Sequence, residues 1–190
     1  MTEGAGLRER KKDRTRKRLH DTAVRLFLER GFDQVTVAQV ADAADTAVTT
    51  LFAYFPAGKV ALVFDRDEDR AGALTAAIRG RSADQDPLHA IEAFMAHRLP
   101  FDQQDASVAG LLELIISTPA LRDHAHRRWT YCEDALVAVL AEQLSRSDDA
   151  SLRALARLLL ECPDIASRQP RPRAALTTVM GHLRRGWDLG

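Results

Sequence analysis

The sequence predicts an all-α protein with a small N-terminal domain of three helices and a larger helical domain after it. Apolar residues recur every three or four positions along most of the chain, and no stretch alternates in the way that a strand does. Glycine and proline stand between these segments, where helices end or begin. With 190 residues, 46% of them hydrophobic, the chain can form a second core beyond a three-helix domain. We therefore expect one domain at 1–58 and another at 59–190.

The first helix is expected from about Arg8 to Arg30. Its apolar residues fall at positions 19, 23, 26 and 27, which form one stripe for docking on neighbouring helices. Eight basic residues and only two acidic ones lie between positions 8 and 18, although the whole chain has a formal net charge of zero. Positive charge is thus concentrated at the start of this helix, where it can contact the phosphates of a nucleic acid.

A second helix is expected to begin near Val37. Gly31 ends the helix before it, and Thr36 with Gln39 three residues later is typical of a capping box. In that motif the two side chains bind backbone amides that a new helix leaves unpaired.

A tight corner and a third helix follow. Asp45 suits the corner because Asp tolerates left-handed backbone angles, and the third helix is expected from about 46 or 47 to 54. Leu51 and Phe55 should face the small core with Phe52 beside them, and the outward positions are then Ala47, Thr49, Thr50 and Tyr54. Two short helices joined by a tight turn form a helix-turn-helix, whose second helix enters the major groove of DNA.

The rest of the chain predicts amphipathic helices only. Pro87 and Pro119 suit the first turns of two of them. The expected segments are about 59–81, a helix opening at 87, 104–117, 119–144, a helix beginning near 148, and 173–187.

Several other classes of site have little support. Cys132 and Cys162 belong to no metal-spaced pair, so we interpret them as buried thiols. His124 and His126 are two apart on a helix and point to different faces, which disfavours a metal site. Neither a secretion signal nor a membrane span is visible, so we expect a cytoplasmic protein without a cofactor.

The segment from Arg14 to Glu68, with GFDQVTVAQVADAADTAVTTLFAYFP at its centre, resembles the DNA-binding domain of TetR-family transcriptional regulators. The resemblance implies an all-α homodimer whose three N-terminal helices bind double-stranded DNA and whose other helices form a ligand-binding and dimerisation domain. Carried over by position, it implies DNA contacts from Thr36, Gln39, Thr46, Ala47, Thr49, Thr50, Tyr54 and Lys59, to which the basic run adds Arg14 and Lys17. Lys59 follows PAG, one residue later than the family's phosphate-binding lysine.

The resemblance also implies a ligand pocket and a dimer interface in the second domain. Candidate ligand-binding residues are Phe94, Met95, Arg98, Glu113 and Trp129, for which ordinary core packing, or an Arg98–Glu113 ion pair, is an equal alternative. The dimer interface is expected from the stripe of the last helix, formed by Leu176, Met180, Leu183 and Trp187.

The expected function is that of a repressor released from a palindromic operator by a small-molecule effector. The recognition helix has no Arg, Lys, Asn or Gln, so Gln39, the basic arm and DNA shape should supply much of the sequence preference. An activator of the same family, or a helical protein-interaction module without DNA binding, remains open. An enzyme is disfavoured because the sequence has no phosphate-binding glycine loop, nucleophile elbow or paired-carboxylate motif.

Overall fold

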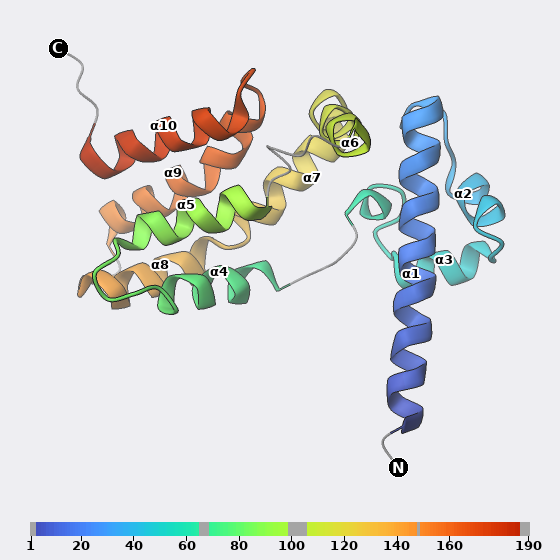
Figure 1. The fold of residues 1–190 in the computed structure, drawn as a ribbon, viewed down its shortest axis with the longest axis horizontal. Coiled ribbons are helices and arrows are strands. Elements are labelled where there is room, and N and C mark those ends of the chain that lie inside the picture. Colours follow the sequence, from blue (N-terminus) through green and yellow to red (C-terminus); the bar gives the residue numbers. More distant parts are fainter. Residues whose placement is uncertain (1–2, 65–68, 99–105, 148, 187–190) are drawn as a thin grey trace. The chain divides into compact units, whose positions relative to one another are not determined.

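The computed structural model describes residues 3–64, 69–98, 106–147 and 149–186. Every regular element in these ranges is helical, which confirms the all-α fold class (Figure 1). The elements are α1 (Glu3–Arg30), α2 (Val37–Ala43), α3 (Val48–Tyr54), the 3₁₀ helix η1 (Ala61–Val63), α4 (Arg70–Arg79), α5 (Pro87–Arg98), α6 (Ala106–Ser117), α7 (Pro119–Thr130), α8 (Glu133–Leu144), α9 (Ala150–Ser167) and α10 (Pro172–Arg185). No helix in the described ranges is both long enough and apolar enough to cross a lipid bilayer.

The chain forms two compact units. The first comprises residues 1–67 together with 110–121, and the second comprises 68–109 together with 122–190. The first unit therefore includes η1 and parts of α6 and α7 in addition to the helices expected at 1–58. The expected boundary after residue 58 remains a prediction about where the two functions divide.

In the first unit, α2 and α3 lie beside the middle of the long helix α1 (Figure 1). The apolar stripe of α1 is fully buried, as its helical spacing predicts, and it shares one core with side chains of α2, α3 and η1. Leu121 at the start of α7 closes this core. Leu51 is the one fully buried residue of α3, so most of that helix is available for contact with another molecule.

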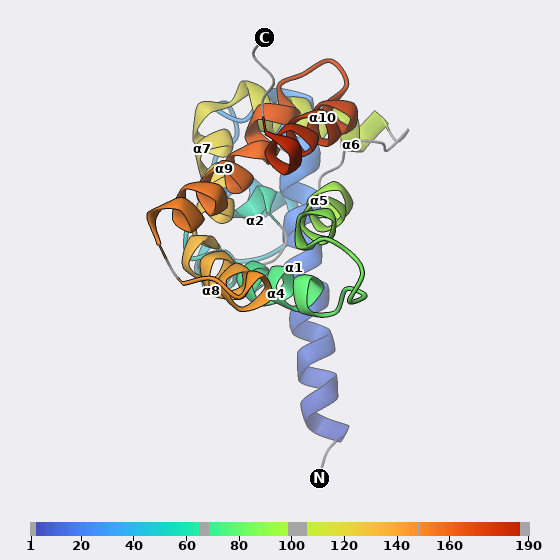
Figure 2. The same cartoon turned by 90° about the vertical axis from the view of Figure 1, so that its left-hand side faces the viewer.

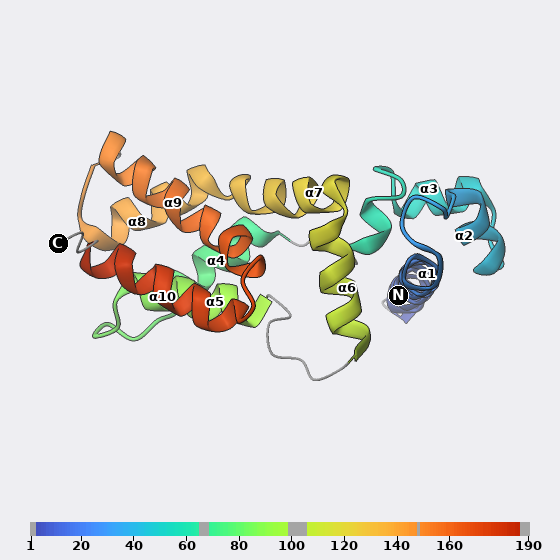
Figure 3. The same cartoon turned by 90° about the horizontal axis from the view of Figure 1, so that it is seen from above.

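Five helices of the second unit form a ring, and most of α7 belongs to the same unit. Helix α4 contacts α5, α5 contacts α10, α10 contacts α9, α9 contacts α8, and α8 returns to α4 (Figure 2). Helices α9 and α10 form one side of this ring, as the view in Figure 3 also shows.

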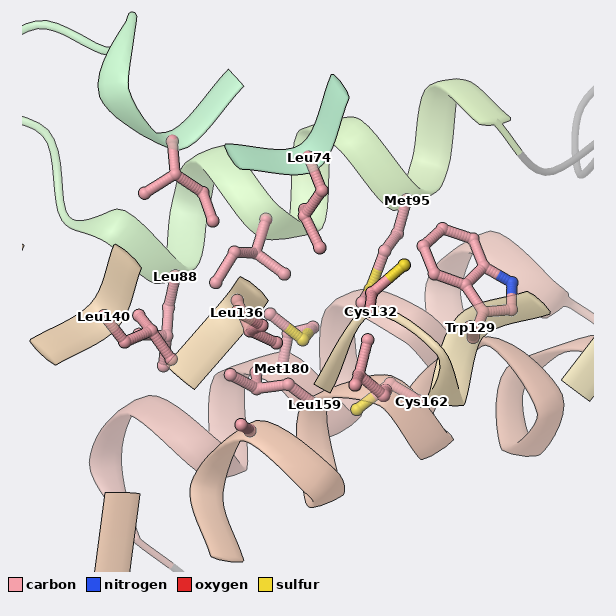
Figure 4. Close-up of a cluster of buried hydrophobic side chains, with 14 of the residues drawn as sticks. Leu74, Leu88, Met95, Trp129, Cys132, Leu136, Leu140, Leu159, Cys162 and Met180 are labelled. Carbon is pink, nitrogen blue, oxygen red and sulfur yellow. The ribbon is translucent and has the colours of Figure 1, made fainter. Parts of the chain in front are cut away.

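The ring encloses a core of leucine, methionine and cysteine side chains with one tryptophan at its end (Figure 4). Cys132 and Cys162 are both buried there, in agreement with their interpretation as structural thiols. Burial raises the pKa of Cys132 and raises that of Cys162 to about 12, so both side chains are neutral thiols at physiological pH.

The helix expected at 119–144 is wrong, because two helices replace it. The backbone turns at Tyr131 and Cys132, where the amide of Cys132 donates to the carbonyl of Trp129 at 2.9 Å, three residues back. Helix α8 then begins with Glu133 and Asp134 in its first turn, where carboxylates are favoured by the helix dipole. No glycine or proline marks this turn, so the sequence shows it only through that acidic pair.

The continuous helix expected at 59–81 is also wrong. Phe64 after η1 has extended backbone angles (φ −109°, ψ 99°), which end the helical segment. Helix α4 begins at Arg70, where the carboxylate of Asp69 accepts a hydrogen bond from the amide of Gly72 at 2.8 Å. An aspartate cap thus starts a new helix inside the segment that had been expected to form one continuous helix.

Candidate nucleic-acid interface

The N-terminus of α2 is fixed by the capping box that the sequence predicts. The hydroxyl of Thr36 accepts a hydrogen bond from the amide of Gln39 at 3.2 Å, and Oε1 of Gln39 accepts one from the amide of Thr36 at 2.8 Å. Both side chains are exposed. Because capping uses the oxygen of Gln39, its amide nitrogen keeps two donors for a DNA phosphate or base.

The corner between α2 and α3 is held by Asp45, whose φ of 48° lies in the left-handed region. The amide of Asp45 donates to the carbonyl of Asp42 at 3.0 Å, and the amide of Thr46 donates to that of Ala41 at 2.9 Å. This pair of bonds is the Schellman motif, which ends a helix and reverses the chain in a fixed direction. The predicted left-handed corner at Asp45 is confirmed.

Helix α3 is held by its buried side and by a contact from α1 at its C-terminal end. Leu51 and Phe55 are buried in the shared core, as expected. Arg16 of α1 donates from a guanidinium nitrogen to the carbonyl of Tyr54 at 2.8 Å, and its guanidinium carbon lies 4.5 Å from the centre of the Phe55 ring. One member of the basic run therefore stabilises the recognition helix. Sequence analysis missed this role because the basic run gives no sign of which cation turns inward.

The outer face of α3 is uncharged. Ala47 and Thr49 are exposed, and Thr46, Thr50 and Tyr54 are half-buried. Phe52 was expected beside the core, but 45% of it is exposed, and that expectation is wrong. The physical reason is helix geometry, since one residue beyond the buried Leu51 turns the side chain by about 100° around the axis.

Helix α1 contributes exposed positive charge to the same unit. Arg14 and Lys17 are both exposed, and the ammonium of Lys17 forms an ion pair with Asp21 one turn later at 2.7 Å. Such a surface pair is weak in water. It therefore leaves Lys17 available to exchange its partner for a phosphate.

Lys59 lies over two aromatic rings of its own domain. Its ammonium nitrogen is 4.2 Å from the centre of the Phe32 ring and 5.9 Å from that of Phe27. Desolvation by burial lowers the pKa of Lys59, with a smaller opposing effect from Asp33. The side chain is thus half-buried over two aromatic rings of its own domain, a cation–π arrangement that stabilises the domain.

Comparisons with known proteins agree with this geometry. Residues 19–65 match the family model for bacterial regulatory proteins of the tetR family. Over 178 residues the chain is 30% identical to the HTH-type transcriptional regulator TcmR of Streptomyces glaucescens, and the match covers 87% of this chain and 77% of that protein. The chain belongs to the TetR family of transcriptional regulators.

Solved structures show that the TetR-family fold extends over nearly the whole chain. The structure of NalD, the secondary repressor of the MexAB-OprM multidrug efflux pump in Pseudomonas aeruginosa, gives a TM-score of 0.57 at 19% identity, covering 91% of this chain and 95% of that one. FadR of Thermus thermophilus, a repressor solved in complex with lauroyl-CoA, gives 0.58 at 20% identity, covering 92% and 96%. At these identities the likeness establishes the fold alone.

In this TetR-family chain, four of the residues expected at a ligand site lie in the second unit. Met95 and Trp129 are buried in its core. The ring of Phe94 meets that of Trp129 edge-on, with centres 6.3 Å apart, and Arg98 stacks on Phe94 at 4.9 Å. Glu113 is exposed on α6, in the part that belongs to the first unit.

A further side chain completes this aromatic group. The guanidinium carbon of Arg70, at the start of α4, lies 4.3 Å from the centre of the Trp129 ring. We call Arg70, Trp129, Phe94 and Arg98 the cation–aromatic stack. Sequence analysis missed Arg70 because it lies in an acidic run. Among the described residues, no group of three or more His, Cys, Asp or Glu is placed to hold a metal ion.

The predicted dimer residues need correction. Leu176 and Met180 are only 1% and 0% exposed, because they pack into the core of their own subunit and have no surface left for a partner. Leu183 is half-buried against the same core, and Trp187 lies outside the described residues. The exposed apolar side chains on the α9–α10 side of the ring are Leu158 and Ile165, which sequence analysis had not selected.

Proposed function

We propose that two copies of this chain bind a palindromic operator as a repressor and that a small molecule in the second unit releases them. The observation that carries the proposal is the capped and anchored helix-turn-helix beside an exposed basic helix. TetR-family membership supports it, as do the repressors NalD and FadR among proteins of similar fold. We infer that the protein acts by binding and catalyses no reaction.

The DNA contacts follow from exposure and from the available donors. Thr36 and Gln39 at the start of α2, with Arg14 and Lys17 on α1, are proposed to contact phosphates, and the amide nitrogen of Gln39 could also serve a base. Thr49, Thr50 and Tyr54 are proposed to contact DNA from α3, and Thr46 and Ala47 from the turn just before it. Lys59 is left out of this set, because its ammonium already lies over Phe32 and Phe27.

The dimer is proposed to form through the α9–α10 side of the ring. Leu158 and Ile165 are seven residues apart, which places them on one face of α9, and they are 51% and 45% exposed. Burying both against a symmetric copy removes apolar surface from water. Ile165→Asp should therefore give monomers in sedimentation, whereas Leu144→Asp, at an exposed apolar position at the end of α8, should not.

The effector is proposed to bind at the cation–aromatic stack. Two guanidinium groups and two rings offer an aromatic molecule both stacking partners and hydrogen-bond donors. Met95 lines the same core. Phe94→Ala and Arg98→Met should weaken binding of the effector. Operator affinity measured without the effector should stay unchanged.

Release is proposed to occur by a population shift. Arg70 belongs to α4, and α7 supplies Leu121 to the core of the first unit and Trp129 to that of the second. An effector that favours a different arrangement of these helices would lower operator affinity by about 5- to 150-fold, the range of typical coupling energies. A molecule that binds both states equally would have no effect.

The experiment that tests the function is selection of bound sequences from random duplex DNA by the purified full-length protein. An enriched palindrome supports the proposal. Failure to enrich any duplex would favour the alternative of a protein-interaction module without DNA binding. A reporter gene placed behind the selected operator then separates a repressor, which lowers expression, from an activator, which raises it.

A further inference from the structure

Two large apolar side chains lie on the surface of the recognition helix. Val48 and Phe52 are 39% and 45% exposed. They are four residues apart, so they are neighbours on one face of α3. The Phe52 ring lies near the turn after the helix, since one of its carbons would be 3.7 Å from a Cβ added at Gly58. We call Val48 and Phe52 the apolar pair.

The charges of the first unit indicate what covers the apolar pair. Helix α3 has no acidic or basic residue, and Arg14 and Lys17 on α1 of the same unit are exposed. A polyanion is therefore favoured as the partner of this unit. In the major groove of duplex DNA, the one apolar group on a base edge is the C5-methyl group of thymine.

We propose that Val48 and Phe52 contact thymine methyl groups, and that the operator half-site is selected in part by thymines opposite this pair. This proposal rests on the proposed function. It adds which group on the DNA bases can be recognised by a helix α3 that has no Arg, Lys, Asn or Gln. The hydroxyl groups of Thr49 and Thr50 complement the pair by hydrogen bonding, but they do not distinguish the methyl group.

The size of the effect follows from the burial of one methyl group. Burying a methylene-sized group contributes about 0.8 kcal/mol, which is about fourfold in affinity. A dimer makes the contact in both half-sites, so removal of both methyl groups should lower affinity by about 15-fold.

The test replaces thymine by deoxyuridine, which removes the methyl group and keeps every hydrogen-bonding atom. The selected operator is synthesised with deoxyuridine at each thymine position in turn, symmetrically in both half-sites, and affinity for the wild-type protein is measured at fixed salt. At the contacted positions we expect affinity to fall by about 15-fold, because one methyl contact is lost in each half-site. Substitution outside the footprint should have no effect.

Protein variants assign the effect to the apolar pair. Phe52→Ala and Val48→Ala should bind thymine and deoxyuridine operators with nearly equal affinity at the position that each contacts, because the partner of the methyl group is gone. Leu144→Ala, at an exposed apolar position in the second unit, is the matched control and should keep full discrimination. A circular dichroism spectrum and thermal melt of each variant show that the domain stays folded.

Two outcomes overturn the inference in different ways. If wild-type protein binds the selected operator but no thymine position responds to deoxyuridine, or if Phe52→Ala and Val48→Ala keep the same discrimination, methyl recognition by this pair is wrong and DNA binding stands. If the protein binds no duplex specifically, the proposed function is wrong as well.

Discussion

Replacing Arg16 by Met should loosen the recognition helix without removing a DNA contact. The structure ties this side chain to the end of α3 by its hydrogen bond to the Tyr54 carbonyl at 2.8 Å and by its stacking on Phe55 at 4.5 Å. Helix α3 has only seven residues and no side-chain cap at its N-terminus. Its order therefore depends on interactions from outside the helix, and Arg16 supplies both a hydrogen bond and a ring contact.

The magnitude can be worked from those two interactions. A hydrogen bond from a charged donor contributes about 1.5–3 kcal/mol. A partly exposed cation–π contact contributes about 0.5–1 kcal/mol. Because Met keeps part of the packing on Phe55, we expect a net local destabilisation of about 2 kcal/mol, or about 30-fold faster amide exchange in α3.

The assay combines hydrogen exchange with salt-dependent DNA binding, and Arg14→Met is the matched control. Arg14 is exposed on the same helix, so its replacement should leave exchange in α3 unchanged. It should instead reduce the slope of log affinity against log salt by about 0.9 for each phosphate that the variant no longer neutralises. The Arg16→Met variant should keep the wild-type slope. Unchanged protection of α3 together with a reduced slope for Arg16→Met would show that Arg16 contacts DNA and does not hold the end of α3.

Three further changes test other parts of the structure. Lys59→Met should change the free energy of unfolding by less than about 1 kcal/mol, since an apolar chain can replace the ammonium over Phe32. DNA binding measured at several salt concentrations should give the wild-type slope of log affinity against log salt. A smaller slope would show that Lys59 makes the phosphate contact that the family resemblance implies. Glu92→Gln should destabilise the second unit by about 3 kcal/mol in urea denaturation, because it breaks a mostly buried ion pair with Arg184 whose partners are each only 16% exposed. The value is at the low end for a buried pair because Gln keeps an oxygen that can accept from Arg184, and stability equal to wild type would contradict the prediction. Asp149 caps α9 by accepting from the Leu152 amide at 2.8 Å, a bond that holds the pKa of its carboxyl below the usual 3.8. The stabilisation by the Asp149 carboxylate is therefore present at neutral pH and is lost as pH falls below 3.8. The difference in Tm between wild type and Asp149→Asn should shrink on acidification. A difference that grows would contradict the role of this carboxylate as the cap of α9.

The parts of the helix-turn-helix that could be predicted are those fixed by local backbone chemistry. A capping box needs only Thr36 and Gln39 at the right spacing, and the left-handed corner needs only a residue that tolerates it, here Asp45. Both signals are complete within a few residues. These two signals therefore predicted a helix between them, and its expected start near Val37 is the observed start of α2.

The features that sequence analysis missed depend on contacts between distant segments. Arg16 differs from Arg14 in sequence only by position, and the carbonyl that it binds lies 38 residues away. Lys59 and Arg70 lie over aromatic rings of other elements, which no local pattern reveals.

The last helix shows the same limit for an apolar stripe. Its spacing marks Leu176 and Met180 as facing something apolar, but it does not show whether that surface belongs to the same subunit or to a partner. The structure assigns both side chains to the core of the subunit. The exposed Leu158 and Ile165 on α9 then become the candidates for the dimer interface.

Hydroxyl-radical footprinting of the full-length protein on its selected operator tests whether two copies of the capped α2–α3 unit bind the two half-sites symmetrically. We expect two protected patches related by a two-fold axis, with centres separated by about one helical turn, 10–10.5 base pairs, or a multiple of that distance. Lower salt should strengthen both patches together. A single protected patch, or protection that is indifferent to salt, would contradict it.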